Sequence, residues 1–369
     1  MRYSFTDEQL QLRDTLRRFL SEVSPPTEVR KLMETEEGFN RKVWERIHEE
    51  LGIGGIHISS DHGGAGLSFV ELAIVLEEMG RALLCAPYLS SCVFASTVIA
   101  TLGSQEQQAK YLPDLVSGKK IGTVALYEDA STFEPSTVAL KFSGGLLTGR
   151  KTLVSDGNVA DIILVLAQDV DMGDSTYCVV DSNDSSVRRH ALTTMDWTRK
   201  LSEIEFDSVP AERLGSKDDI SNQLDYIFNV QITALANEMV GGAEQLLESA
   251  ISYSKERVQF GRSISSLQAI KHKCAETLLE VEFAKSAAYR AAQAIAENDE
   301  NLGEYCSTAK AVANEAYMRA ATECIQIHGG IGFTWENDTH LWFKRAKSSE
   351  VFLGNTQYHR ERYLTEMGL

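Results

Sequence analysis

Two segments of this sequence each place a cationic or polar side chain beside a glycine turn. The first spans residues 253–262 and the second residues 326–333, and both follow long stretches with helical periodicity. The residues that stand out in them are Arg257, Phe260, Gln326, Gly329 and Gly330. A guanidinium presents a planar fork of donors to phosphate oxygens, and adjacent glycines let a ligand approach the backbone closely. The two segments are therefore candidate binding segments.

Two of these positions also have a simpler interpretation. Arg257 follows a helical stretch, where an arginine can stabilise the helix C-terminus from a solvated face. His328 is expected to pack or to donate a hydrogen bond rather than to act as a catalyst. No cluster of histidine, cysteine and acidic residues with metal-ligand spacing surrounds it, so we predict no metal site.

Glu238 is the acidic residue whose surroundings suit proton transfer. It lies among small and apolar residues at positions 234–243, so its carboxylate is expected to be desolvated and to take up a proton more readily. The alternative is a buried structural glutamate that is paired with a cation elsewhere in the chain. Glu244 and Glu248 follow on the same stretch and are expected to be solvated or salt-bridged.

Composition limits the classes of protein that fit. The chain has 369 residues, 43% hydrophobic and 24% charged, with a formal net charge of −17, which favours a packed globular protein. This charge disfavours binding to nucleic acids and to anionic membranes. The N-terminus lacks the apolar segment of a signal peptide, and no apolar run is long enough to span a membrane. The six cysteines form no CxxC pair, which is typical of a reducing compartment, so we expect a cytoplasmic protein without membrane insertion.

The order of the predicted elements is helical, then β, then helical. Residues 1–120 have helical periodicity with capping-box pairs, and residues 121–216 contain short runs rich in β-branched residues between turn signals. Residues 217–369 return to long amphipathic stretches, with helices expected at 220–256, 265–298 and 304–327. The fold class is therefore predicted as α+β, with an N-terminal helical domain, a middle antiparallel β-domain and a C-terminal helical bundle.

This order and several motifs resemble the acyl-CoA dehydrogenase family over nearly the whole chain. Besides the two candidate binding segments, the similar stretches lie at residues 61–66, 195–199 and 206–210. The chain is particularly similar to the small subunits of bacterial heteromeric acyl-CoA dehydrogenases. The resemblance implies a four-helix bundle at the C-terminus and an FAD held between the middle and C-terminal domains, against a neighbouring subunit. It further implies a homo- or hetero-oligomer, a dimer or a tetramer, with a related acyl-CoA dehydrogenase subunit.

The resemblance also implies roles for residues at the two candidate binding segments. Arg257 matches the arginine that pairs with the FAD pyrophosphate, and Phe260 matches the aromatic residue that packs beside it. Gln326, Gly329 and Gly330 match the loop whose backbone approaches the adenosine end of the cofactor.

Further FAD contacts are implied with weaker matches. Ser155 keeps the hydroxyl that hydrogen-bonds the reactive edge of the flavin, although Leu153 replaces the family tryptophan two positions earlier. Tyr127 lies where another flavin-edge residue is expected. Asn355 and Gln357 match positions after the catalytic loop that touch FAD, and both side chains can hydrogen-bond phosphate or ribose.

The residues that would carry catalysis depart from the family pattern. The family glutamate that removes the α-proton of an acyl-CoA precedes a late glycine, and this position is Leu353. A second family location for the base corresponds to Gln231. Glu238, seven residues or about 10.5 Å farther along the same helix, therefore becomes the predicted catalytic base.

Two functions follow from the resemblance. The first is FAD-dependent dehydrogenation of an acyl-CoA thioester to a trans-2-enoyl-CoA, with electrons passed to an electron-transfer flavoprotein. The alternative is a non-catalytic partner subunit that completes the FAD site of a heteromeric acyl-CoA dehydrogenase.

Overall fold

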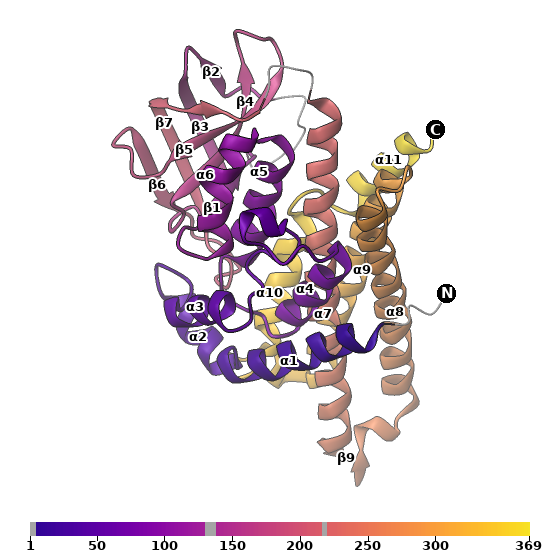
Figure 1. Cartoon of the computed structure of the whole chain (residues 1–369). Helices are drawn as coiled ribbons and strands as arrows, with labels where there is room; N and C mark the ends of the chain where they lie inside the picture. The colour runs from indigo at the N-terminus through magenta and orange to yellow at the C-terminus, as the bar shows by residue number, and fades with distance from the viewer. Residues whose placement is uncertain (1–4, 130–137, 216–219) are drawn as a thin grey trace. The chain divides into compact units, whose positions relative to one another are not determined.

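The computed structural model describes residues 5–129, 138–215 and 220–369. The chain divides into two compact units. The unit that we call the bundle unit comprises Met1–Arg30, Phe69–Leu84 and Ile232–Leu369. The sheet unit comprises Lys31–Ser68 and Cys85–Gln231. Figure 1 shows the helices and strands of both. In the described part of the chain, no helix is both long enough and apolar enough to cross a membrane.

Long helices dominate the bundle unit. Its helices are α1 (Asp7–Val23), α4 (Phe69–Arg81), α8 (Gln268–Glu297), α9 (Leu302–His328), α10 (Thr339–Val351) and α11 (Thr356–Glu366), together with most of α7 (Ser221–Glu256). α1 begins with a capping box in which Thr6 and Gln9 satisfy each other's backbone N–H groups. The helix α2 (Pro26–Glu34) runs from the bundle unit into the sheet unit.

α4 and α7 cross at an unusually short distance because each contributes a glycine. A Cβ atom on Gly80 would lie 1.9 Å from the carbonyl oxygen of Glu238, and one on Gly241 would lie 1.8 Å from that of Glu77. Atoms cannot approach so closely, so no larger residue fits at either position without separating the two helices. This contact fixes Glu238 next to α4.

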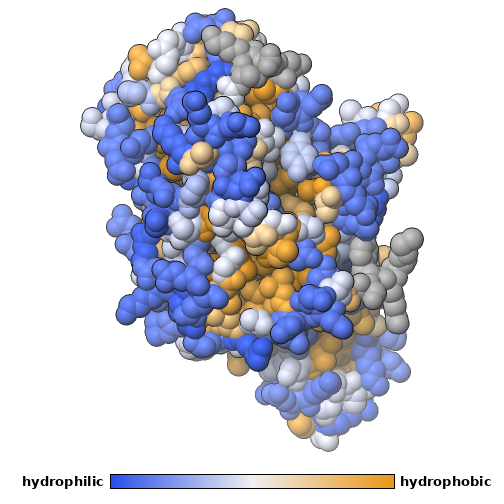
Figure 2. All heavy atoms as spheres, viewed as in Figure 1, coloured by the Kyte–Doolittle hydropathy of each residue, from blue (hydrophilic) through white to orange (hydrophobic). Residues whose placement is uncertain are grey.

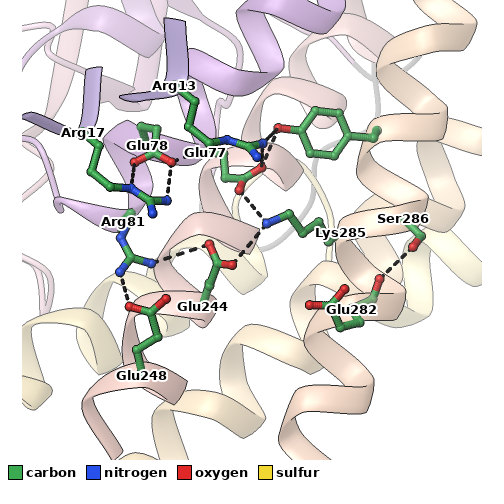
Figure 3. A network of polar contacts seen from close by, with 11 residues as sticks. Arg13, Arg17, Glu77, Glu78, Arg81, Glu244, Glu248, Glu282, Lys285 and Ser286 are labelled. Carbon is green, nitrogen blue, oxygen red and sulfur yellow. Dashed lines mark hydrogen bonds and ion pairs between the residues drawn. The ribbon is translucent and has the colours of Figure 1, made fainter. Parts of the chain in front are cut away.

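A network of ion pairs joins four helices of the bundle unit, α1, α4, α7 and α8 (Figure 3). Its members are Arg13, Arg17, Glu77, Glu78, Arg81, Glu244, Glu248, Lys285 and Tyr289. Glu77 and Glu78 are each only 1% exposed, so their charges require partners inside the protein. Lys285 lies 2.8 Å from Glu77 and 3.1 Å from Glu244 and so connects α8 to both α4 and α7.

The sheet unit contains one eight-stranded sheet with the order β6-β7-β3-β2-β4-β5-β8, and β1 also pairs with β4. The strands are β1 (Gly122–Ala125), β2 (Lys141–Ser143), β3 (Leu146–Ser155), β4 (Ile162–Asp169), β5 (Ser175–Asp181), β6 (Val187–Ala191), β7 (Leu201–Pro210) and β8 (Glu212–Arg213). Most pairings are antiparallel, but β4 runs parallel to both β1 and β2. The sheet is therefore mixed rather than purely antiparallel.

Shorter helices complete the sheet unit. They are α3 (Arg41–Glu49), η1 (Ser60–His62), the π-helical segment η2 (Tyr88–Ala95), α5 (Ser96–Leu102) and α6 (Gln105–Val116). η2 packs on β1, and seven of its eight residues are buried. Its buried side chains place it on the sheet rather than at the surface.

The predicted fold class is confirmed. The three long C-terminal helices begin and end within a few residues of the predicted positions. The predicted domain boundaries at 120/121 and 216/217 stay predictions, and the second lies outside the described residues.

Figure 2 shows a largely hydrophilic face with apolar side chains gathered in its middle, over α4, α7 and α10. Elsewhere, α8 exposes the apolar side chains of Leu278, Leu279 and Phe283, which are 47%, 57% and 64% accessible. Apolar surface of this kind is typical of ligand or subunit contacts.

Candidate functional site

The structure brings the two candidate binding segments together at one end of the bundle unit. The rings of Tyr253, in the last turn of α7, and His328, at the end of α9, stack with centroids 4.2 Å apart and an interplanar angle of 20°. The Tyr253 hydroxyl also donates to the His328 carbonyl oxygen at 3.5 Å. Arg257 lies one turn beyond Tyr253, so this stack places its segment beside the glycine loop.

The first segment forms a short two-stranded ribbon of β9 (Val258–Gln259) and β10 (Arg262–Ser263). Phe260 and Gly261 make its two-residue turn with φ of 54° and 73°, the combination of positive values that suits a tight hairpin. The Phe260 side chain is 91% exposed. Among the described residues the exposed guanidinium of Arg257 has no hydrogen-bond or ion-pair partner. A projecting ring and a free cation fit a contact outside this chain.

The second segment presents bare backbone. Gly329 and Gly330 open the 3-10 helix η5 (Gly329–Phe333), and Gly329 has φ of 65°. A Cβ atom added to either glycine would meet no atom within 4 Å. Gln326 is exposed one turn earlier on α9. This surface has the form that a cofactor needs for close approach to backbone groups.

Ser155 and Tyr127 belong to the sheet unit. The Ser155 hydroxyl is buried, and no hydrogen-bond partner for it exists within the described chain. An orphaned buried hydroxyl of this kind fits the polar edge of a flavin. Tyr127 is also buried, and its backbone carbonyl accepts from the N–H of Thr152 at 2.7 Å. The predicted FAD residues thus fall into two groups, one in each unit.

An ion pair that the sequence did not reveal supports the strand that carries Ser155. Lys151 is fully buried in β3, and its ammonium donates to Glu128 at 2.8 Å and to the carbonyl of Leu126 at 3.0 Å. Burial lowers the pKa of Lys151, although Glu128 opposes this effect. Leu153, two residues farther along, has φ of 52° within a bulge of the β3–β7 pairing.

Leu353 precedes Gly354 and is completely buried with φ of 58°. Its carbonyl oxygen accepts a hydrogen bond from Nε2 of His359 at 2.8 Å, and the Gly354 carbonyl accepts from Lys310 at 3.1 Å. Burial, together with the nearby cation of Lys310, lowers the pKa of His359 to about 3. The loop at this position is therefore fixed by its own backbone and carries no acidic side chain.

Asn355 and Gln357 lie at the start of α11. The side-chain oxygen of Asn355 accepts from the N–H of Tyr358 at 2.9 Å and so caps this helix. Its amide NH₂ group is left for other contacts. Gln357 is exposed. Asn355 thus has a structural role that the sequence analysis missed, although an asparagine before a helical stretch is a usual capping signal.

Glu238 is buried in α7 and forms an ion pair with Arg345 of α10. The distance from Oε1 of Glu238 to Nη1 of Arg345 is 2.7 Å, and the two side chains are 10% and 5% exposed. This contact agrees with the alternative interpretation of a buried structural glutamate. Gln231, one position that a family base could occupy, is buried, and its Nε2 has no hydrogen-bond partner among the described residues.

Glu244 and Glu248 are salt-bridged, as the sequence indicated. Glu244 pairs with Lys285 at 3.1 Å and with Arg81 at 3.5 Å, while Glu248 pairs with Arg81. Burial opposes ionisation of Glu244, but the neighbouring cations hold its pKa below the usual value. Both residues belong to the network of Figure 3, where their ion pairs hold α7 against α4 and α8.

The chain is similar to known proteins over nearly its whole length. Residues 6–119 match the N-terminal domain and residues 223–367 the C-terminal domain of the acyl-CoA dehydrogenase family models. The acyl-CoA dehydrogenase IpdE2 of Mycolicibacterium smegmatis is 30% identical over 98% of this chain and 99% of its own length. CarC, a subunit of the caffeyl-CoA reductase–Etf complex of Acetobacterium woodii, is 28% identical over 96% of each chain. The crystal structure of the ChsE4–ChsE5 complex of Mycobacterium tuberculosis superposes with a TM-score of 0.90 at 27% identity, covering 100% of this chain and 99% of that one.

Proposed function

Because the chain belongs to the acyl-CoA dehydrogenase family, we propose that it takes part in the FAD-dependent conversion of an acyl-CoA thioester to a trans-2-enoyl-CoA, with an electron-transfer flavoprotein as electron acceptor. The observation that carries the proposal is the free guanidinium of Arg257 beside the open surface of Gly329 and Gly330. The name of CarC, which belongs to a complex with Etf, supports the choice of acceptor.

The residues of this chain would contact FAD in two groups, one in each unit. Arg257 would pair with the pyrophosphate, Phe260 would pack beside it, and the backbone at Gly329–Gly330 would lie against the adenosine. Ser155 would hydrogen-bond the flavin edge. FAD, when bound, supplies the acceptor for the hydride that leaves the β-carbon of the substrate.

The exposure of the first segment supports a cofactor site that is shared between subunits. Phe260 projects with 91% of its surface accessible and contacts little of its own chain. A ring and a cation presented in this way suit an FAD that is held mainly by a neighbouring subunit. The proposed assembly is an oligomer with identical or related acyl-CoA dehydrogenase subunits.

Two candidate functions differ in which residue acts as the base that removes the α-proton of the acyl-CoA. In the first, Glu238 removes the α-proton, which requires its carboxylate to leave or share the hydrogen bond of Arg345. In the second, a partner subunit supplies the base and this chain completes its FAD site. The second candidate is favoured by the ion pair of Glu238 and by the absence of an acid at Leu353 and Gln231. The relative whose solved structure is a ChsE4–ChsE5 complex supports it further.

Replacement of Glu238 by glutamine separates the two candidates. The full chain is purified alone and together with a candidate partner subunit, supplied with FAD, and mixed anaerobically with an acyl-CoA. If Glu238 is the base, the variant loses at least about 1,000-fold in the rate of flavin bleaching, since proton abstraction is blocked. If the partner supplies the base, Glu238→Gln keeps its rate in the complex. Glu248→Gln is the matched control, because Glu248 lies on the same helix in the network of Figure 3.

A further inference from the structure

The stacked rings of Tyr253 and His328 belong to neither of the roles assigned above. The stack joins the two segments proposed to bind FAD, since Arg257 follows Tyr253 by one helical turn and Gly329–Gly330 follow His328 directly. This position makes the stack the physical link between the cation and the bare backbone that would contact one cofactor.

His328 is held so that its ring faces Tyr253. It is 8% exposed, and its Nδ1 lies 2.8 Å from the carbonyl oxygen of Cys324, to which it donates. Farther back along both helices, α7 and α9 already pack closely, since a Cβ atom on Gly242 would lie 2.4 Å from the hydroxyl oxygen of Tyr317. The Tyr253–His328 stack is a further α7–α9 contact, 11 residues beyond Gly242 and Tyr317 toward the binding segments.

The covalent chain between the two segments cannot set their spacing on its own. From Phe260 to Gln326 it runs along the whole of α8 and back along α9, helices of 30 and 27 residues. Phe260 is 91% exposed, so its ribbon gains little support from other packing. The stack connects the last turn of α7 directly to the end of α9, so it can set the distance between the two segments without the intervening chain.

We propose that Tyr253 and His328 are positioning residues, whose stacked rings hold Arg257 and the Gly329–Gly330 backbone at the spacing required by the pyrophosphate and adenosine of one FAD. The inference rests on the proposed function for the identity of the cofactor. The ring of residue 328, rather than its imidazole nitrogens, is what the role requires, because the stack at 4.2 Å and 20° is a contact between ring faces.

The test compares His328→Ala with His328→Phe in the full-length protein, alone and with a candidate partner subunit. Tyr305→Ala is the control, since Tyr305 also contributes a ring to a side-chain contact, with Arg290 at 4.1 Å. It lies on the same helix about 34 Å from His328. One readout is amide hydrogen exchange in residues 253–266 and 326–334 without FAD, and the other is the dissociation constant of FAD from flavin fluorescence.

His328→Ala is expected to raise exchange at least about 5-fold in both segments and to weaken FAD binding at least about 10-fold. His328→Phe restores both readouts to within about 2-fold, and the control changes neither. Unchanged exchange in His328→Ala overturns the inference even if the protein binds no FAD. Equal FAD affinity of His328→Ala and the wild type also overturns it. A wild-type protein that binds no FAD in any assembly refutes the proposed function instead, and the exchange result still decides whether the stack couples the segments.

Discussion

Replacing Arg345 by methionine should destabilise the bundle unit more than removing both members of its ion pair. Arg345 and Glu238 are 5% and 10% exposed and meet at 2.7 Å, so the methionine variant removes the cation that pairs with this buried carboxylate. Breaking a buried pair in this way costs about 3–5 kcal/mol of unfolding free energy. Methionine keeps most of the volume of the arginine stem, so loss of packing contributes little.

The double variant Glu238→Leu with Arg345→Met removes both charges and fills the space with apolar atoms. Replacement of a buried pair by hydrophobic residues is often neutral or stabilising by about 1–4 kcal/mol. The double variant is therefore expected to be at least as stable as the wild type. The coupling between the two positions should then exceed about 3 kcal/mol.

The measurement is urea unfolding followed by circular dichroism, at one protein concentration because subunit association adds to stability. Wild type, both single variants and the double variant complete the cycle. A cost below about 1 kcal/mol for Arg345→Met would refute the reasoning, because it would mean that Glu238 reaches solvent or another cation. Additive effects of the two single changes would refute it as well. Either result would return Glu238 to the role of a carboxylate that is free to act as a base.

Three further outcomes are expected. Gly80→Ala should lower the unfolding free energy by more than about 3 kcal/mol, measured by urea titration, because the new methyl would lie 1.9 Å from the backbone of Glu238 and outweigh any gain in helix propensity. Gly330→Ala should leave stability unchanged within about 0.5 kcal/mol and weaken FAD binding in a fluorescence titration, because its Cβ meets open space in this chain. A loss of about 1.4 kcal/mol of unfolding free energy in Gly330→Ala, with unchanged FAD affinity, would contradict the role of Gly330 in binding FAD. His359 has a folded-state pKa of about 3 against an ordinary value of 6.5, so its contribution is present above pH 6.5 and is lost as the pH falls toward 3. In that window His359→Gln should reduce the slope of unfolding free energy against pH by about 1.4 kcal/mol per pH unit, and an unchanged slope would show that His359 is not buried as a neutral ring.

The sequence predicted the long helices well because their signal is local. Periodic apolar residues placed α7 within one residue of its observed start, and two capping boxes, at Thr6 and Ser104, are present within the predicted helical region 1–120. Short runs of β-branched and apolar residues indicated strands β1, β4, β5 and β7. β6 was missed because three of its five residues, Arg188, Arg189 and His190, are exposed and polar.

The site was predicted only where a motif marks it. The resemblance paired the segment of Arg257 with that of Gln326, but nothing in the sequence indicated that Tyr253 and His328 make the contact between them. Arg345 was missed as the partner of Glu238 because the two are separated by 107 residues along the chain. Tertiary packing alone brings such residues together, so the alternative of a paired glutamate could be stated without naming its cation.

The proposal that Arg257 holds FAD is tested most directly by the FAD content of Arg257→Gln in the assembled protein. Loss of a charge-assisted contact to phosphate is worth about 1.5–3 kcal/mol, or roughly a 10- to 100-fold rise in the dissociation constant. We predict that wild-type protein, alone or with its partner subunit, binds FAD and that Arg257→Gln binds it at least about 10-fold more weakly with unchanged unfolding behaviour. Wild-type protein that stays colourless in FAD in every assembly, or a variant that binds FAD as tightly as the wild type, would contradict the account.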